Sequence, residues 1–211
     1  MRLTDGEDRI LLVSKGGQAA LFSEQKVRAM GRSASGVTGM KLVGDDEVIA
    51  LRVPREDDDV LVLTDGGYGK RTPISEYRET GRGAKGVRTI SAKAEAERGS
   101  LVAAHCVTGE EDLIVTTAGG IVTRMSVGEV RSMGRSTSGV RIQRIKGEED
   151  RVSSCAIVPA EEEVDEEPAG DAPAAEAPAP VVEGEDDAVS DVTPAEDDGD
   201  AGEPADDADE E

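Results

Sequence analysis

The sequence predicts an all-β fold of three propeller-like blades, each about 50 residues long. A seven-residue signature, G-R-x-[AT]-x-G-V, occurs at Gly31–Val37, Gly81–Val87 and Gly134–Val140, with offsets of 50 and 53 residues. Gly-Gly pairs recur with the same offsets, at 16/17, 66/67 and 119/120. Short apolar runs of β-type residues flank each pair. A period of this length built from short strands is typical of propeller blades, and the strand-type patterning excludes helical solenoids.

The first repeat, 9–58, is predicted to contain four short strands. Arg9–Ser14 and Gln18–Phe22 flank the first Gly-Gly pair and form a β-hairpin, because glycine adopts the positive φ angles of tight hairpin turns. A polar loop that carries the signature follows the hairpin. The third and fourth strands are predicted at Gly36–Val43 and Glu47–Val53.

The second repeat, 59–111, and the third, 112–158, follow the same plan, after a polar lead-in at 1–8. The strands of the second repeat are predicted at Val60–Thr64, Tyr68–Pro73, Gly86–Ile90 and Ser100–Val107. Those of the third repeat are predicted at Asp112–Thr117, Ile121–Met125, Val140–Ile145 and Arg151–Val158. The segment Ala92–Arg98 favours a helix, which we expect as an insertion between the third and fourth strands of the second repeat.

Charge divides the chain into two regions. Residues 159–211 hold 23 of the 46 Asp and Glu residues and no Lys or Arg, which leaves 23 acidic and 24 basic residues in 1–158. The acidic region is rich in Ala and Pro and has no aromatic residue. It cannot bury enough apolar surface to offset its ordering entropy, so we expect a disordered acidic C-terminal tail at 159–211.

The sequence contains no recognisable catalytic, metal or cofactor site. His105 and Cys106 are adjacent but lack a second cluster of ligands, so a buried strand position is expected for them. The spacing Gly81-x-Gly83-x-x-Gly86 matches a dinucleotide fingerprint, but neither the strand before it nor the helix after it is predicted. Two cysteines exclude a disulfide framework. The N-terminus, Met1–Asp8, has no apolar run, so neither a signal peptide nor a membrane span is expected, which predicts a cytoplasmic protein with no membrane contact.

Basic residues recur at two positions of the repeat. One arginine lies three residues before the first signature glycine and another lies directly after it, and further Lys and Arg lie nearby or on the hairpins. The candidate DNA-contact residues are Arg28, Arg78, Arg131, Arg32, Arg82, Arg135, Lys70, Arg71, Lys85, Arg88, Arg124 and Arg141. Blades stacked side by side would align these cations in a stripe that binds phosphates without reading bases.

The scarcity of aromatic residues favours duplex DNA over single strands, which are bound largely by base stacking. An alternative stays open for the repeated arginines: they pair with neighbouring acids or cap carbonyls between blades. The DNA role is favoured for the arginines that directly follow the glycine.

Three stretches, Val27–Arg32, Gly67–Thr72 and Val130–Arg135, resemble the blades of the C-terminal domain of DNA gyrase A. Together with the period and the Gly-Gly turns, the resemblance covers about 9–158. It implies a β-pinwheel, of which these repeats look like the last three of six blades. It also implies right-handed wrapping of duplex DNA around a basic rim, which supports ATP-dependent negative supercoiling by the whole enzyme, a type II topoisomerase, and a nucleoid-associated location.

The chain departs from that family in two respects. The family's first blade carries a box of the Gln-Arg-Arg-Gly-Gly-Lys-Gly type, to which Arg82–Gly86 is the nearest approach. The part with the catalytic tyrosine is also absent. DNA cleavage, ATP and magnesium would therefore belong to other parts of the enzyme, and the rest of gyrase A and gyrase B are the implied partners.

The open ends of the repeat array allow further expectations. Three blades leave two open sheet edges, which predicts either an open arc or self-association of two copies.

Two other functions remain possible on the sequence: the related C-terminal domain of topoisomerase IV, and a propeller-like scaffold for protein–protein interaction.

Overall fold

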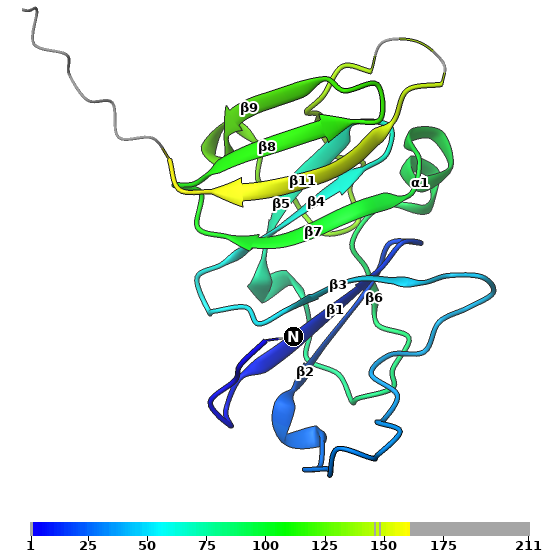
Figure 1. Ribbon diagram of the computed structural model, residues 1–211, viewed down its shortest axis with the longest axis vertical. Helices are drawn as coiled ribbons and strands as arrows, with labels where there is room; N and C mark the ends of the chain where they lie inside the picture. The colour runs from blue at the N-terminus through cyan, green and yellow to red at the C-terminus, as the bar shows by residue number, and fades with distance from the viewer. Residues whose placement is uncertain (1, 146, 148, 161–211) are drawn as a thin grey trace, which may run out of the picture. The chain divides into compact units, whose positions relative to one another are not determined.

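The computed structural model describes residues 2–145, 147 and 149–160, and the fold of this part is almost entirely β (Figure 1). Three sheets with antiparallel strand pairing follow one another, and one short helix lies between two strands. The predicted all-β fold of three blades is confirmed. The sequence predicts a disordered tail at 159–211, and residues 161–211 lie outside the described part of the chain. No helix of the described residues is long and apolar enough to cross a membrane.

Each sheet is built on one hairpin. Sheet 1 has the order β3-β1-β2-β6, with β1 at Arg9–Ser14, β2 at Gln18–Ser23, β3 at Val48–Arg52 and β6 at Val87–Arg88. Sheet 2 has the order β10-β5-β4-β7, with β4 at Asp59–Thr64, β5 at Tyr68–Pro73, β7 at Leu101–Val107 and β10 at Val140–Arg141. Sheet 3 has the order β11-β8-β9, with β8 at Asp112–Thr117, β9 at Val122–Ser126 and β11 at Val152–Val158.

Positive-φ glycines close the three hairpins, as the sequence predicts. Gly17, Gly67 and Gly120 have φ angles of 77°, 80° and 83°, which side chains with a Cβ rarely adopt. Each of these glycines is the second of its Gly-Gly pair. The hairpin and signature residues of repeats 1 and 2 are therefore equivalent at an offset of 50, and those of repeats 2 and 3 at an offset of 53.

A single 3₁₀ turn follows each hairpin, which the sequence analysis did not anticipate. These turns are η1 at Glu24–Lys26, η2 at Ile74–Glu76 and η3 at Val127–Glu129. The hydroxyls of Ser23 and Ser126 cap two of them by accepting hydrogen bonds from backbone N–H groups. The predicted helix is confirmed as α1, Ala92–Arg98, whose first turn is capped by the Ser91 hydroxyl.

The predicted strand composition of the blades is wrong in one respect, because the second and third repeats each give their third strand to the sheet before them. β6 of the second repeat pairs with β2, with Val87 opposite Ala19, and β10 of the third repeat pairs with β5, with Val140 opposite Gly69. The corresponding strand predicted at Gly36–Val43 does not form, and sheet 3 has three strands instead of four. Apolar alternation predicts a strand but not which sheet receives it.

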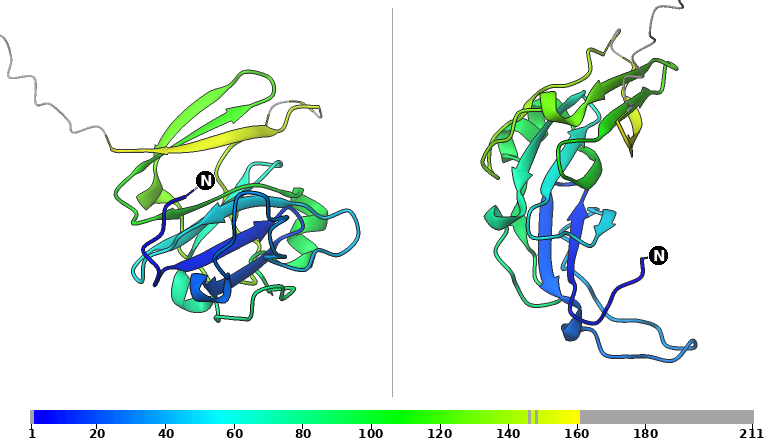
Figure 2. Two further views of the ribbon diagram at one scale, coloured as in Figure 1. Left: turned by 60° about the horizontal axis from the view of Figure 1, so that its bottom comes forward. Right: turned by 90° about the vertical axis from the view of Figure 1, so that its left-hand side faces the viewer.

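Two cores lie between consecutive sheets, and a smaller one, Leu12, Ala20, Phe22 and Met40, lies within the first repeat. In β4, Val60 and Val62 belong to the core shared with sheet 1, and Leu61 belongs to the core shared with sheet 3. This two-sided burial explains why β4 is a continuous apolar run rather than an alternating one. The edge strands β3, β7 and β11 lie side by side in successive sheets, as both Figure 1 and Figure 2 show.

Candidate functional site

The signature arginines of the second and third repeats lie at the junctions between blades. Arg82 donates through Nε to the Lys26 carbonyl (3.1 Å) and through Nη1 to the Thr38 carbonyl (2.7 Å). Arg135 makes the equivalent pair of hydrogen bonds, from Nε to Glu76 O (3.2 Å) and from Nη1 to Arg88 O (2.9 Å). The acceptors are equivalent residues of the preceding repeat. Arg82 and Arg135 therefore cap carbonyls between blades, which is the alternative to the DNA role that the sequence favours for them.

The backbone before each signature also joins the preceding sheet. Thr80 N donates to Leu21 O (2.7 Å), and Leu21 and Glu79 form a parallel bridge. At the next junction, Met133 N donates to Arg71 O (2.9 Å) and Arg71 N donates to Arg131 O (3.2 Å). The second and third repeats therefore bond to the preceding sheet both before and after the signature loop, and the loop of the second repeat adds a hydrogen bond from Gly83 N to Gly39 O (2.7 Å).

The last glycine of the signature permits this close approach. Gly86 and Gly139 have φ angles of 85° and 74°. A Cβ at Gly86 would lie 2.3 Å from Ala19 O, and one at Gly139 would lie 2.7 Å from Gly69 O. Since those distances are far below van der Waals contact, a side chain at either position would prevent the strand exchange.

These contacts predict different effects for equivalent arginine substitutions. Arg82→Ala and Arg135→Ala each remove two charge-assisted hydrogen bonds and should lower the free energy of unfolding by about 1.5–3 kcal/mol. Arg32→Ala should change it by less than about 0.5 kcal/mol, because Arg32 is exposed and has no side-chain hydrogen bond within the described part of the chain. Urea denaturation in dilute solution measures the difference. Equal losses at all three positions would contradict the assigned role.

Two candidate DNA-contact residues of the second hairpin are corrected by the structure. Lys70 is only 1% exposed, and its ammonium donates to Gly134 O (2.7 Å), to Arg135 O and to the Thr137 hydroxyl (3.1 Å). Burial, with Arg135 nearby, lowers the pKa of Lys70 to about 8. Arg71 pairs with Asp59 (3.5 Å) and donates to Val130 O (2.8 Å). Both cations bond to the next repeat; Lys70 is buried and Arg71 is partly buried.

Three further candidate residues are near the surface but have partners. Arg88 pairs with Glu95 (2.9 Å) and Arg124 pairs with Asp112 (2.8 Å). Arg141 donates to the Tyr68 hydroxyl (2.8 Å). The Tyr68 ring also lies under two guanidinium groups, at 4.5 Å from Arg98 and 5.3 Å from Arg141. The hydrogen bond from Arg141 lowers the pKa of Tyr68.

The remaining five candidates are exposed, and none makes a side-chain hydrogen bond or ion pair with the described part of the chain. They are Arg28, Arg32, Arg78, Lys85 and Arg131. Three of them, Arg28, Arg78 and Arg131, occupy one repeated position, the second residue after each 3₁₀ turn. The residue before each, Val27, Tyr77 or Val130, packs inward, so every blade presents one arginine from a fixed backbone position. The packing role predicted for Tyr77 is confirmed, since it is 3% exposed.

A cavity of about 630 Å³ contains His105 and both cysteines. His105 Nδ1 lies 3.4 Å from Arg52 Nη2, and burial lowers the pKa of His105 to about 4. Burial also raises the thiol pKa of Cys106 to about 12 and that of Cys155 to about 11. The thiols are therefore protonated at neutral pH, which makes them poor nucleophiles and poor metal ligands.

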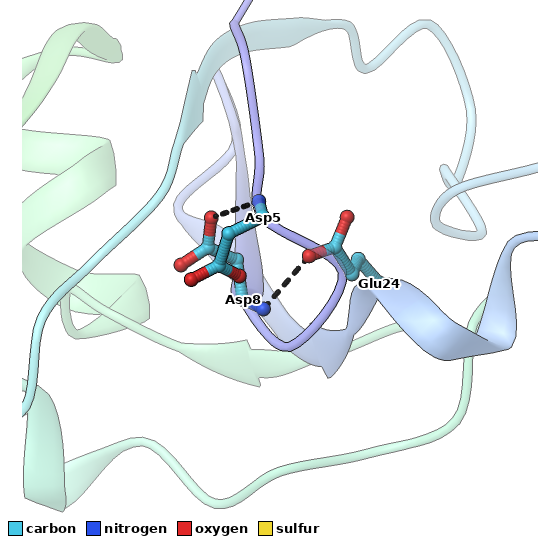
Figure 3. Close-up of side chains that lie close together, drawn as sticks. All are labelled: Asp5, Asp8 and Glu24. Carbon is cyan, nitrogen blue, oxygen red and sulfur yellow. Dashed lines mark hydrogen bonds between the residues drawn. The ribbon is translucent and has the colours of Figure 1, made fainter.

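An acidic cluster, Asp5, Asp8 and Glu24, lies where the residues before β1 meet η1 (Figure 3). Glu24 Oε1 accepts hydrogen bonds from Gly6 N (2.7 Å) and Asp8 N (2.8 Å), and Glu24 Oε2 accepts one from the Thr4 hydroxyl. The Thr4 hydrogen bond lowers the pKa of Glu24. These contacts hold the residues before β1 against η1, so the cluster has a local structural role.

Comparison with known proteins places these features in a family. The family model of the DNA gyrase C-terminal domain, a β-propeller, matches three segments, 8–55, 58–108 and 111–159. The DNA gyrase A protein of Staphylococcus aureus (strain MRSA252) is 41% identical over 169 residues, which cover 79% of this chain and 18% of the relative. The chain thus spans about a fifth of the length of the curated relatives that it matches.

Two solved structures have the same arrangement of strands. A DNA gyrase A C-terminal domain superposes with a TM-score of 0.67 at 26% identity, over 74% of this chain and 52% of that one. The C-terminal domain of a DNA topoisomerase IV superposes with a TM-score of 0.69, also at 26% identity, over 75% of this chain and 49% of that one.

Proposed function

Because the chain belongs to the DNA gyrase C-terminal domain family, we propose that it binds and wraps duplex DNA as part of a DNA gyrase. The observation that carries this proposal is the exposed arginine repeated once per blade, at Arg28, Arg78 and Arg131. Arg32 and Lys85, in the signature loops of the first and second repeats, add exposed charge.

The mechanism is electrostatic. Cations without protein partners can bind DNA phosphates and release the counterions condensed on the DNA. This release gives an affinity that is independent of base sequence. Bending a duplex of 20–30 base pairs costs on the order of 1–6 kcal/mol, so contacts from several blades must act together. Arg141, which is exposed at the outer edge of sheet 2, would add a contact while its planar group stays against Tyr68.

The cations that hydrogen-bond to a neighbouring blade have a structural role in this function. Arg82, Arg135 and Lys70 tie each signature loop to the preceding blade. They fix the spacing at which successive blades present their exposed arginines. A surface whose backbone is already fixed in the binding conformation loses less conformational entropy when DNA binds.

The chemistry of strand passage would reside elsewhere in the enzyme. The proposed partners are the rest of gyrase A and gyrase B, which would supply the cleavage tyrosine, ATP hydrolysis and magnesium. With duplex DNA as the ligand, the protein would act in the cytoplasm at the nucleoid.

A C-terminal domain of topoisomerase IV is the second candidate, since such a domain superposes as well as that of gyrase A. The gyrase function differs from the topoisomerase IV function in one property that the resemblance to gyrase implies. The gyrase domain wraps duplex DNA in a right-handed path, which gives the bound DNA positive writhe. Ligation of a nicked plasmid in the presence of the chain separates them. A raised linking number supports the gyrase function, and an unchanged linking number despite DNA binding supports the alternative.

A further inference from the structure

The junction between the first and second repeats presents two lysines that the next junction lacks. Lys41 and Lys85, one from each repeat, line a hollow of about 440 Å³. Both side chains are exposed, and neither makes a hydrogen bond or an ion pair within the described part of the chain. Lys85 is already a candidate DNA contact. Lys41 is not, since its equivalent in the second repeat is the uncharged Ser91.

Backbone hydrogen bonds fix the two lysines beside each other. Gly83 N donates to Gly39 O (2.7 Å), and Lys41 N donates to the carbonyl of Ala84 (2.9 Å), the residue before Lys85. The loop of the first repeat therefore runs along the signature loop of the second, and the two lysine side chains start from neighbouring backbone positions.

The equivalent pair at the second junction shows how close such side chains lie. At the repeat offsets of 50 and 53, Lys41 corresponds to Ser91 and Lys85 to Ser138, and the two serine hydroxyl oxygens are 3.3 Å apart. The backbone hydrogen bond of Lys41 recurs there as well, from Ser91 N to Thr137 O (3.4 Å). The first junction thus carries two positive charges where the second carries two neutral groups.

The second junction has a structural use for one of these positions that the first lacks. The Ser91 hydroxyl accepts a hydrogen bond from Ala94 N (3.1 Å) and so caps α1, which begins directly after it. The corresponding segment of the first repeat, 42–47, forms a turn and no helix. Lys41 therefore has no helix to cap, and any residue type could make its backbone contact, so its charge is available to a ligand.

The acids of the hollow do not neutralise the two lysines. Asp46 accepts a hydrogen bond from Gly16 N (2.7 Å), and Glu95 pairs with Arg88 (2.9 Å). Asp45 is exposed and forms no ion pair with either lysine. Two adjacent ammonium groups repel each other, and an anion held between them removes that repulsion.

We propose that Lys41 and Lys85 together bind one phosphate of duplex DNA across the first junction, a contact that the second junction does not make. This inference rests on the proposed function and adds to it a residue, Lys41, and a place, the boundary between two blades. A phosphate suits the site because two ammonium groups can donate to different oxygens of the same anion. By mass action, DNA bound across the boundary should also stabilise the folded chain.

Amine labelling followed by mass spectrometry tests the site in the unmodified 211-residue chain. With duplex DNA well above its Kd, acetylation of Lys41 and Lys85 should slow by at least about threefold, because most sites are then occupied. Lys93, which pairs with Glu97 on α1, is the internal control and should be labelled at a nearly unchanged rate. Inorganic phosphate at the same ionic strength should protect none of the three. An unchanged rate at Lys41, or equal protection by phosphate, would overturn the proposal.

Neutralising the pair gives an independent test by fluorescence anisotropy. Lys41→Gln with Lys85→Gln should weaken duplex binding about five- to tenfold at low salt and reduce the salt slope by about 0.9, the value for one phosphate. Arg55→Gln with Lys93→Gln removes the same net charge outside the site, and should leave the affinity within about twofold. Equal losses in the two double variants would show that only net charge matters.

Thermal unfolding separates binding from a structural role. The Lys41 and Lys85 variant should unfold at the same temperature as the unmodified chain or above it, since it loses a repulsion and no hydrogen bond. A lower unfolding temperature would assign the lysines to the fold. If the unmodified chain binds no duplex, the proposed function fails together with this site. If it binds duplex and the variant binds equally well, this inference alone fails.

Discussion

The triple substitution Arg78→Glu, Lys85→Glu and Arg131→Glu is expected to weaken duplex binding by at least about tenfold at low salt, which corresponds to about 1.4 kcal/mol. These three side chains are exposed and make no side-chain hydrogen bond or ion pair within the described part of the chain. Loss of three phosphate contacts should also reduce the slope of log K against log salt by about 2.7. Fluorescence anisotropy of a labelled duplex across a salt series measures both quantities.

A control variant with two charge reversals outside the repeated positions tests how far a general change of net charge weakens binding. Lys93 is exposed on α1 and paired with Glu97, outside the repeated positions, and Arg55 is exposed on the loop before β4. Lys93→Glu with Arg55→Glu should leave the affinity within a few-fold and the salt slope nearly unchanged. If the triple variant folds and still binds like the unmodified chain, the repeated cations are not the DNA surface, and the scaffold function becomes the better account.

Removal of residues 159–211 is expected to tighten duplex binding by about tenfold at low salt. The removed region carries 23 carboxylates and no cation, and the remainder of the chain is close to neutral. Tethered carboxylates compete with DNA phosphates for the same arginines, and they also lower the local potential that attracts DNA. Salt screens this competition, so the difference between the two chains should shrink as the salt concentration rises.

The control for this deletion keeps the length and removes the charge. A chain with every Asp and Glu of 161–211 replaced by Asn or Gln should bind as tightly as the truncated one. Equal affinity of the unmodified and truncated chains would contradict the competition, and a neutral tail that still weakens binding would indicate a steric cause.

The three hairpins could be predicted from sequence because their determinants are local. A Gly-Gly pair with one positive-φ glycine closes each turn, and the flanking apolar runs specify strands such as β5, Tyr68–Pro73, which has its predicted bounds. The short exchanged strands could not be assigned in the same way. Val87 reads as a strand residue whichever sheet receives it, and the choice depends on contacts with Ala19, in another repeat.

The site was predicted only in part for a similar reason. Repetition identified Arg28, Arg78 and Arg131, but it also identified Arg82 and Arg135, which recur because each junction between blades needs them. A repeated position indicates a repeated environment, which is an exposed surface that we propose binds DNA for Arg28, Arg78 and Arg131, and a blade junction for Arg82 and Arg135. Lys70 offered one usable signal: its equivalents are Ala20 and Thr123, so its charge is not a repeated feature.

The linking number of a ligated plasmid tests the central claim, wrapping by the repeated cations, most directly. A nicked circular plasmid is sealed by ligase with increasing amounts of the chain, the protein is removed, and the topoisomers are separated by electrophoresis. We predict a shift toward positive linking difference that grows with the amount of bound protein and is lost in the Arg78, Lys85 and Arg131 triple variant. An unshifted distribution at saturating binding, or a shift that the triple variant retains in full, would contradict this account.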